Sequence, residues 1–122
     1  MLPMHTNARG TIFGGVILAN IDLAAYMATR EHLAHSNTSP AHDYATKAMR
    51  EVVFIAPVYV GDLVSYYSEV INEGRTSLTI RVEVESQRFE DPTRVVKVTG
   101  AEVVYVAIDA EGRPTPLRAD VT

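Results

Sequence analysis

Cysteine is missing from this sequence of 122 residues, and so is tryptophan. Without cysteine the chain has no disulfide framework, no cysteine-ligated zinc and no cysteine nucleophile. This absence fits a reducing compartment, and we expect the protein to be cytoplasmic. The length suits one domain over residues 1–122, built around a single hydrophobic core.

A surplus of positive charge is lacking too, because the formal net charge is −4. A negative balance argues against a nucleic-acid surface. Asp22 interrupts the best candidate for an apolar run that spans a bilayer. The first residues, MLPMHTNARG, have neither the cationic start nor the apolar stretch of a secretory signal. We therefore expect neither a nucleic-acid partner nor a membrane partner.

Several motifs of catalysis and cofactor binding are also absent. The chain contains no G-x-S-x-G elbow, no P-loop and no dinucleotide fingerprint. His32 and His35 lie three residues apart and His42 follows, a grouping that admits a metal site. No H-E-x-x-H-type pattern supports it, so solvent-facing histidines in a polar loop are the favoured interpretation. We expect no metal and no cofactor.

Residues 14–33 are predicted to form one long helix. Gly14 and Gly15 lie at its start, and most of the following residues favour helix. Most of its circumference is apolar up to Thr29, which is typical of a buried helix. The polar segment 35–46, which contains a proline, is predicted to be a loop.

Four strand-like runs follow, over residues 49–58, 63–72, 77–88 and 95–108. The third alternates apolar and polar residues, so one face should be buried and the other wet. Short turns separate the last three runs and indicate antiparallel hairpins, and Gly100 suggests a bulge or bend in the last strand. The predicted fold class is therefore α+β, with an antiparallel sheet curved around one central helix. Exposed sheet edges favour pairing with a second copy.

Asp22 is the unusual residue of the helix. Its helix-surface neighbours, which include Leu18 and Tyr26, carry no positive charge. One interpretation places it on a narrow wet stripe or has it cap a backbone group. The other makes it a buried carboxylate with a task, because burying a charge is costly. The apolar surroundings favour burial, and such a carboxylate can act as a base toward water.

The start of the helix offers a second chemical element. Its first N–H groups have no intrahelical partner, and Gly14 and Gly15 leave room for a ligand carbonyl to approach them. These are the ingredients of an oxyanion hole, although the glycines alone fit tight loop packing equally well. Gly15 and Asp22 lie about 10 Å apart along the helix, too far to serve one small reacting centre within a single chain. A site shared by two subunits removes this difficulty. Asn7 is a polar contributor to such a site or, taken alone, a turn or cap residue.

The segment TNARGTIFGG at residues 6–15, together with the helix and Asp22, resembles the hotdog-fold acyl-CoA thioesterases of the YciA-like group. The match continues through FIAPVYVGD at 54–62, GRTS at 74–77 and VYVAID at 104–109. It covers almost the whole chain. The first motif with Asp22 at its spacing is the more specific part, because the later pieces occur more widely among hotdog proteins.

The resemblance implies a hotdog dimer, often a trimer of dimers, that hydrolyses acyl-CoA to free CoA and a carboxylic acid. Asp22 would be the catalytic aspartate, as general base or nucleophile, and the Gly15 N–H would polarise the thioester. Asn7, supplied by the other subunit, would orient water or the thioester. The substrate-binding residues implied by the family or by their place in the motifs are Gly14, Phe54, Arg75, Thr76 and Ser77.

Two other hypotheses compete with hydrolysis. A non-catalytic acyl-CoA binding or sensing module could use the same scaffold, because a fold does not determine a function. A dehydratase or isomerase acting on thioesters would need a histidine at the site. The early and central helix contains none.

Overall fold

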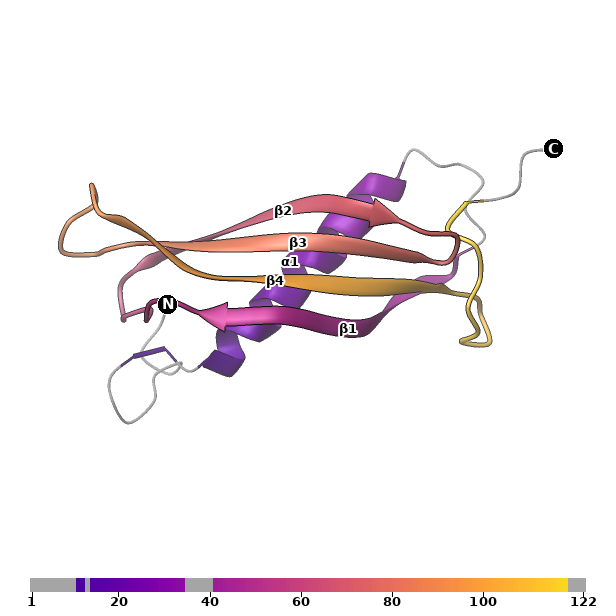
Figure 1. Ribbon diagram of the computed structural model, residues 1–122, viewed down its shortest axis with the longest axis horizontal. Coiled ribbons are helices and arrows are strands. Elements are labelled where there is room, and N and C mark those ends of the chain that lie inside the picture. Colours follow the sequence, from indigo (N-terminus) through magenta and orange to yellow (C-terminus); the bar gives the residue numbers. More distant parts are fainter. Residues whose placement is uncertain (1–10, 13, 35–40, 119–122) are drawn as a thin grey trace.

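The structure is a computed structural model that describes residues 11–12, 14–34 and 41–118. Two predictions, for Asn7 and His35, lie outside these residues. The described elements are α1 (Gly14–Leu33), β1 (Asp43–Phe54), β2 (Leu63–Glu73), β3 (Ser77–Gln87) and β4 (Val95–Ile108). Figure 1 shows the strands as one layer, with α1 running diagonally across one face of the sheet.

The sheet is antiparallel throughout, and its strand order is β1-β4-β3-β2. The β2–β3 and β3–β4 pairs are hairpins, whereas β1 comes directly after the helix and pairs with the last strand. Among the described strands, β1 and β2 therefore form the two edges. This arrangement confirms the predicted α+β fold, with one helix against an antiparallel sheet.

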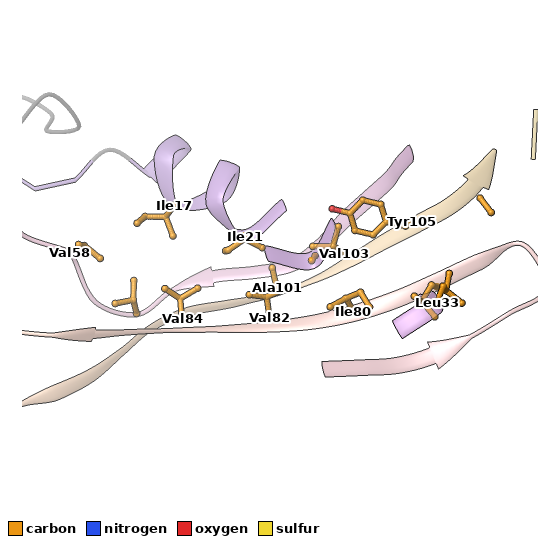
Figure 2. Packing of buried hydrophobic residues seen from close by; sticks show 14 of the residues in the cluster. Ile17, Ile21, Leu33, Val58, Ile80, Val82, Val84, Ala101, Val103 and Tyr105 are labelled. Atoms are coloured by element: carbon orange, nitrogen blue, oxygen red, sulfur yellow. The ribbon is translucent and has the colours of Figure 1, made fainter. Parts of the chain in front are cut away.

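The core lies between α1 and the inner face of the sheet. Five residues at four-residue spacing are buried on α1, namely Ile17, Ile21, Ala25, Thr29 and Leu33. On β3 the predicted alternation places four fully buried residues against them, namely Leu78, Ile80, Val82 and Val84. Figure 2 shows Ile17 and Ile21 of the helix above Val82 and Val84 of β3. Each such aliphatic side chain contributes about 1.5–3 kcal/mol relative to exposure, so this seam holds the helix on the sheet.

The first strand differs from its prediction. It begins at Asp43 rather than at residue 49, so residues 43–46 are strand and not loop. These residues are polar or small, but they pair in register with β4, from Asp43 with Ile108 to Thr46 with Tyr105. Backbone pairing with a distant strand overrides the local composition, which indicated a loop.

The helix is less buried than its composition indicated. In the single chain only one stripe of α1 is covered, and Leu23 and Met27 on the opposite side are 57% and 62% exposed. The sheet covers one side of a helix, and the described part of the chain has no second layer over the other side. The prediction of a helix buried all round is wrong for a single copy.

The predicted irregularity in β4 lies near Gly100 rather than at it, because Val98 is the extra residue opposite β3. Gly100 pairs with Glu83 on one side and with Val53 on the other, and register shifts lie close to it on both sides, between Arg50 and Val53 of β1 and between Val84 and Glu85 of β3. Close approach gives a further reason for the glycine at position 100. A Cβ there would lie 2.7 Å from Oε2 of Glu83 and 2.8 Å from Nη2 of Arg81, so the glycine leaves space for these two side chains.

Candidate active site

Asp22 lies at the seam between the helix and the sheet, and it is half-buried rather than fully buried. Its carboxylate oxygen Oδ1 accepts a hydrogen bond from the Tyr105 hydroxyl at 2.6 Å and from the Thr46 hydroxyl at 2.9 Å. The two donors stand on neighbouring strands, where Thr46 and Tyr105 are paired residues. The three side chains thus form a polar cluster at the edge of an apolar core.

Tyr105 reaches the carboxylate from inside the core. Its side chain is 1% exposed, and its ring packs against the Tyr26 ring at a centroid distance of 6.0 Å. Burial, and after it the hydrogen bond to Asp22, raise the pKa of the Tyr105 hydroxyl well above its ordinary value. The phenol therefore stays protonated in ordinary buffers and remains a donor.

Sequence reasoning missed Tyr105 and Thr46. Tyr105 belongs to the last strand, where alternation indicates an inward-facing position, and a buried tyrosine hydroxyl usually needs a partner. That signal points to some polar partner but does not identify Asp22, which is 83 residues away in the chain. Thr46 was assigned to a loop, so its pairing with β4 was not visible.

The start of the helix brings two predicted binding residues together. A Cβ on Gly14 would lie 3.6 Å from Cζ of the Phe54 ring, which comes from the end of β1. Gly15, the next residue, is exposed. It lies in the first turn, where the backbone N–H has no intrahelical acceptor and points out along the axis with the positive end of the dipole. Seven residues separate Gly15 from Asp22 along α1, so the two groups are about 10 Å apart along the axis.

Arg75, Thr76 and Ser77 lie at the connection between β2 and β3, apart from the helix start. Their backbone is tied to the end of the chain. The Arg75 carbonyl accepts from the Leu117 N–H at 2.8 Å, and the Thr76 carbonyl accepts from the Ala107 N–H at 2.8 Å. In the described part of the chain, the Arg75 side chain forms no ion pair. It is exposed and available to an anion.

Most other cations of the sheet are already paired. Arg81 and Lys97 both contact Glu83, at 2.8 and 3.1 Å, on the face away from the helix. Arg88 pairs with Asp62 at 2.7 Å. These three have less to offer a phosphate than Arg75 has. Among the described residues no group of three or more metal-ligating side chains occurs, and His32 instead contacts Glu73 at 3.3 Å.

A hollow of about 360 Å³ lies near the turn between β3 and β4, at the other end of the sheet from Arg75. Tyr59, Asp62, Arg88 and Phe89 are among its lining residues, and Asp22 is not. Arg88 stacks over the Tyr59 ring at 5.0 Å and also donates to the Pro57 carbonyl. These contacts tie loop segments together, so we interpret this region as structural. No helix in the described ranges is long and apolar enough to cross a membrane.

Comparison with known proteins shows the family of the chain. The family model of the thioesterase superfamily matches residues 9–90. The acyl-CoA thioester hydrolase YciA of Salmonella typhimurium is 34% identical over 118 residues, which are 95% of this chain and 84% of the relative. The chain belongs to the thioesterase superfamily.

Solved structures of hotdog thioesterases are similar to this chain. Cj0915 of Campylobacter jejuni, a hexameric hotdog fold thioesterase, has a TM-score of 0.80 and 42% identity, covering 95% of this chain and 84% of the other. HI0827, a hexameric broad specificity acyl-coenzyme A thioesterase, has a TM-score of 0.81 and 32% identity, covering 98% and 77%. The fold is the hotdog fold, and the resemblance to this group of thioesterases is confirmed.

Proposed function

We propose that this protein hydrolyses acyl-CoA thioesters to free CoA and a carboxylic acid. The observation that carries the proposal is the Asp22 carboxylate, which two hydroxyl groups hold at the seam between helix and sheet. A half-buried carboxylate without a cationic partner is costly in a structural role, but it suits a base or a nucleophile. The acyl-CoA hydrolases among the relatives supply the substrate class.

In the proposed reaction, the Gly15 N–H donates to the thioester carbonyl oxygen and stabilises the negative charge that develops there. Asp22 removes a proton from a water molecule, whose oxygen attacks the carbonyl carbon. The tetrahedral intermediate then expels the CoA thiolate, which takes up the proton. Alternatively, Asp22 attacks the carbon directly, the C–S bond breaks and CoA leaves as the thiolate, and water then hydrolyses the mixed anhydride to the carboxylic acid and free Asp22. Both routes use the same carboxylate.

We further propose that the site is completed by a second copy of the chain. Gly15 and Asp22 of one chain lie about 10 Å apart along α1, so each pairs more easily with groups of a neighbouring subunit. Asn7 of the other subunit would orient the water or the thioester. The exposed edge strand β1 and the uncovered residues Leu23 and Met27 offer surface for such pairing. The hexameric relatives suggest a trimer of dimers.

The bound CoA would place its phosphates near cations. Arg75, which is exposed and unpaired within the described residues, is the best candidate, with Thr76 and Ser77 beside it as hydrogen-bond donors. Gly14 and Phe54 at the helix start would line the acyl end of the site. We propose no cofactor and no metal for this reaction.

The first experiment measures thiol release from acyl-CoAs of short to long chain length, by the wild type and by Asp22→Asn. The substitution keeps the shape of the side chain and removes the base, so we expect a rate loss of roughly 10²–10⁴. Asp43→Asn is the matched control. Asp43 lies at the same seam and accepts a hydrogen bond from the Tyr26 hydroxyl at 2.6 Å, but it has no role in the proposed reaction.

Each outcome decides between the hypotheses. Turnover by the wild type and by Asp43→Asn, with loss in a folded Asp22→Asn, supports the proposal. Equal rates for all three proteins exclude the role of Asp22. Binding of acyl-CoA without thiol release from any substrate favours the sensing module instead.

A second experiment tests whether two subunits share the site. Asp22→Asn and Asn7→Ala are each inactive as pure proteins if both residues are needed. In a mixed dimer one site combines the intact Asp22 of one chain with the intact Asn7 of the other. A statistical mixture should therefore recover about a quarter of the wild-type activity, because half of the dimers are mixed and one of their two sites is intact. If both residues act within one chain, mixing restores nothing.

A further inference from the structure

The two oxygens of the Asp22 carboxylate have different surroundings. Oδ1 accepts from both Tyr105 and Thr46. Oδ2 accepts no hydrogen bond from any residue that the structure describes. A carboxylate that is simply solvated, or that caps a backbone group, has no reason to gather two side-chain donors on one oxygen.

Both donors belong to the sheet, whereas Asp22 belongs to the helix. The Tyr105 ring is 1% exposed among core side chains, and it emerges from the centre of the sheet, because β4 is flanked by β1 and β3. Its hydroxyl also lies 2.6 Å from the backbone carbonyl oxygen of Asp22, so it contacts the helix at two points of one residue. Thr46 pairs with Tyr105 in the sheet, directly before a register shift in β1. The sheet therefore presents two hydroxyls at a defined place on the helix.

An aspartate needs such help to present a single oxygen. The last torsion of its side chain is broad and roughly two-fold, so packing of the methylene group does not determine which oxygen points where. The Tyr105 hydroxyl shares its one proton between Oδ1 and the backbone carbonyl oxygen of Asp22, each at 2.6 Å, and the charge of the carboxylate favours Oδ1 as the acceptor. Two donors on Oδ1 stop the rotation and direct the lone pairs of Oδ2 away from the sheet.

We propose that Tyr105 and Thr46 are positioning residues that hold Oδ1 of Asp22, so that Oδ2 is the oxygen that takes the proton from water or attacks the thioester. The proposal rests on the proposed function, since it assigns roles within that site. Tyr105 and Thr46 touch neither substrate nor reacting atoms. They act on the rate through the orientation of Asp22.

The expected effect is a loss in kcat with little change in KM. Tyr105→Phe removes one donor and keeps the ring in the core, and Thr46→Val removes the other with nearly the same shape. A misplaced base reduces the rate by about 10- to 100-fold, and we expect a loss of this size in kcat from each substitution. KM should change by less than about threefold, because neither residue binds substrate.

Matched controls separate positioning from packing. Thr46→Ser keeps the hydroxyl, so it should retain most of the wild-type kcat. Tyr26→Phe removes a hydroxyl from the ring that packs on Tyr105, but that hydroxyl donates to Asp43 and not to Asp22. Its kcat should stay near the wild-type value. Thr46 is exposed on an edge strand, so Thr46→Val should fold even if Tyr105→Phe does not.

The decisive measurement adds each substitution to Asp22→Asn. If Tyr105 and Thr46 act only through the Asp22 carboxylate, their removal leaves the residual rate of Asp22→Asn unchanged, although each removal is harmful in the wild type. A further loss of equal size in the Asp22→Asn background overturns the proposal. So does wild-type kcat in both Tyr105→Phe and Thr46→Val. In either case the function of Asp22 still stands, whereas a wild type that releases no thiol refutes the proposed function itself.

Discussion

Asp62 should be the most destabilising polar residue to remove from the described structure. It precedes β2, and its carboxylate accepts four hydrogen bonds from residues that the structure describes. The donors and distances are the Tyr59 N–H at 3.0 Å, the Ser86 hydroxyl at 2.8 Å, Arg88 at 2.7 Å and the Phe89 N–H at 3.3 Å. One carboxylate thus ties together the start of β2, the end of β3 and the turn that follows. Asp62→Ala removes all four acceptor contacts at once.

The burial of the Asp62–Arg88 ion pair determines how much free energy of unfolding Asp62→Ala should remove. The side chains of Asp62 and Arg88 are only 3% and 14% exposed, so water cannot replace the lost carboxylate easily. Removing one partner of a buried pair costs about 3–5 kcal/mol, because the remaining charge stays buried without compensation. Domains of this kind have a free energy of unfolding of about 5–15 kcal/mol. The loss is therefore a large share of the total, and we expect a marked drop in the urea midpoint.

The assay is equilibrium unfolding in urea at fixed protein concentration, since association adds to apparent stability. Asp91→Ala is the matched control. Asp91 is an aspartate at the same end of the sheet. Among the described residues its carboxylate accepts only from the exposed Thr93, so its removal should leave the midpoint nearly unchanged. A midpoint for Asp62→Ala equal to that of Asp91→Ala would refute the reasoning.

The pH dependence gives a second test of the same residue. Burial tends to raise the pKa of Asp62, but the hydrogen bonds from Tyr59, Arg88, Ser86 and Phe89 outweigh it and lower the pKa from its ordinary value of 3.8. A carboxyl whose pKa is lower in the folded state stabilises the fold above its unfolded pKa, and this contribution is lost as the pH falls through the folded value. The difference in the free energy of unfolding between wild type and Asp62→Ala should therefore be largest at pH 6 and become smaller below about pH 4. A difference that widens on acidification contradicts this account.

Three further predictions concern backbone and charge geometry. Gly15→Pro removes the proposed oxyanion donor in the first turn, where proline is tolerated, and should reduce kcat by about 10²–10³, whereas Gly15→Ala keeps the N–H and most of the rate. Gly61→Ala should cost more stability in thermal unfolding than Gly112→Ala. Both have positive φ, of 90° and 80°, but only at Gly61 would the Cβ meet a neighbour, the Phe89 ring at 3.1 Å. Arg88→Lys should lower the urea midpoint, because an ammonium group cannot keep the ion pair, the carbonyl contact and the ring stacking together, and an unchanged midpoint would show that the stacking contributes little.

The periodic elements were predictable from the sequence because their signals are local. The bounds of the helix at residues 14 and 33 and of the last strand at residues 95 and 108 agree with the structure. An alternation of apolar and polar residues reports a half-buried strand wherever the strand pairs. Asp22 was visible for the same reason, as a charge on a helix that otherwise reads as apolar.

The start of β1 and the covering of α1 were not predictable locally. Residues 43–46 carry no strand pattern, and they are strand because β4 offers them a hydrogen-bonding edge. Leu23 and Met27 look like core residues in the sequence, yet a single sheet covers only one side of the helix. Which side faces the sheet depends on packing against β2, β3 and β4, which all come later in the chain.

By itself, then, the sequence determined the class of the fold, its main elements and Asp22 as the proposed catalytic carboxylate. Only the tertiary structure decided what holds that carboxylate. Tyr105 and Asp22 are 83 residues apart, and no periodicity or motif relates them. They meet because the register of β1 against β4 and the stripe of α1 that packs on the sheet together bring both hydroxyls to one oxygen. Such contacts are properties of the assembled layers, since each depends on the position of three elements at once.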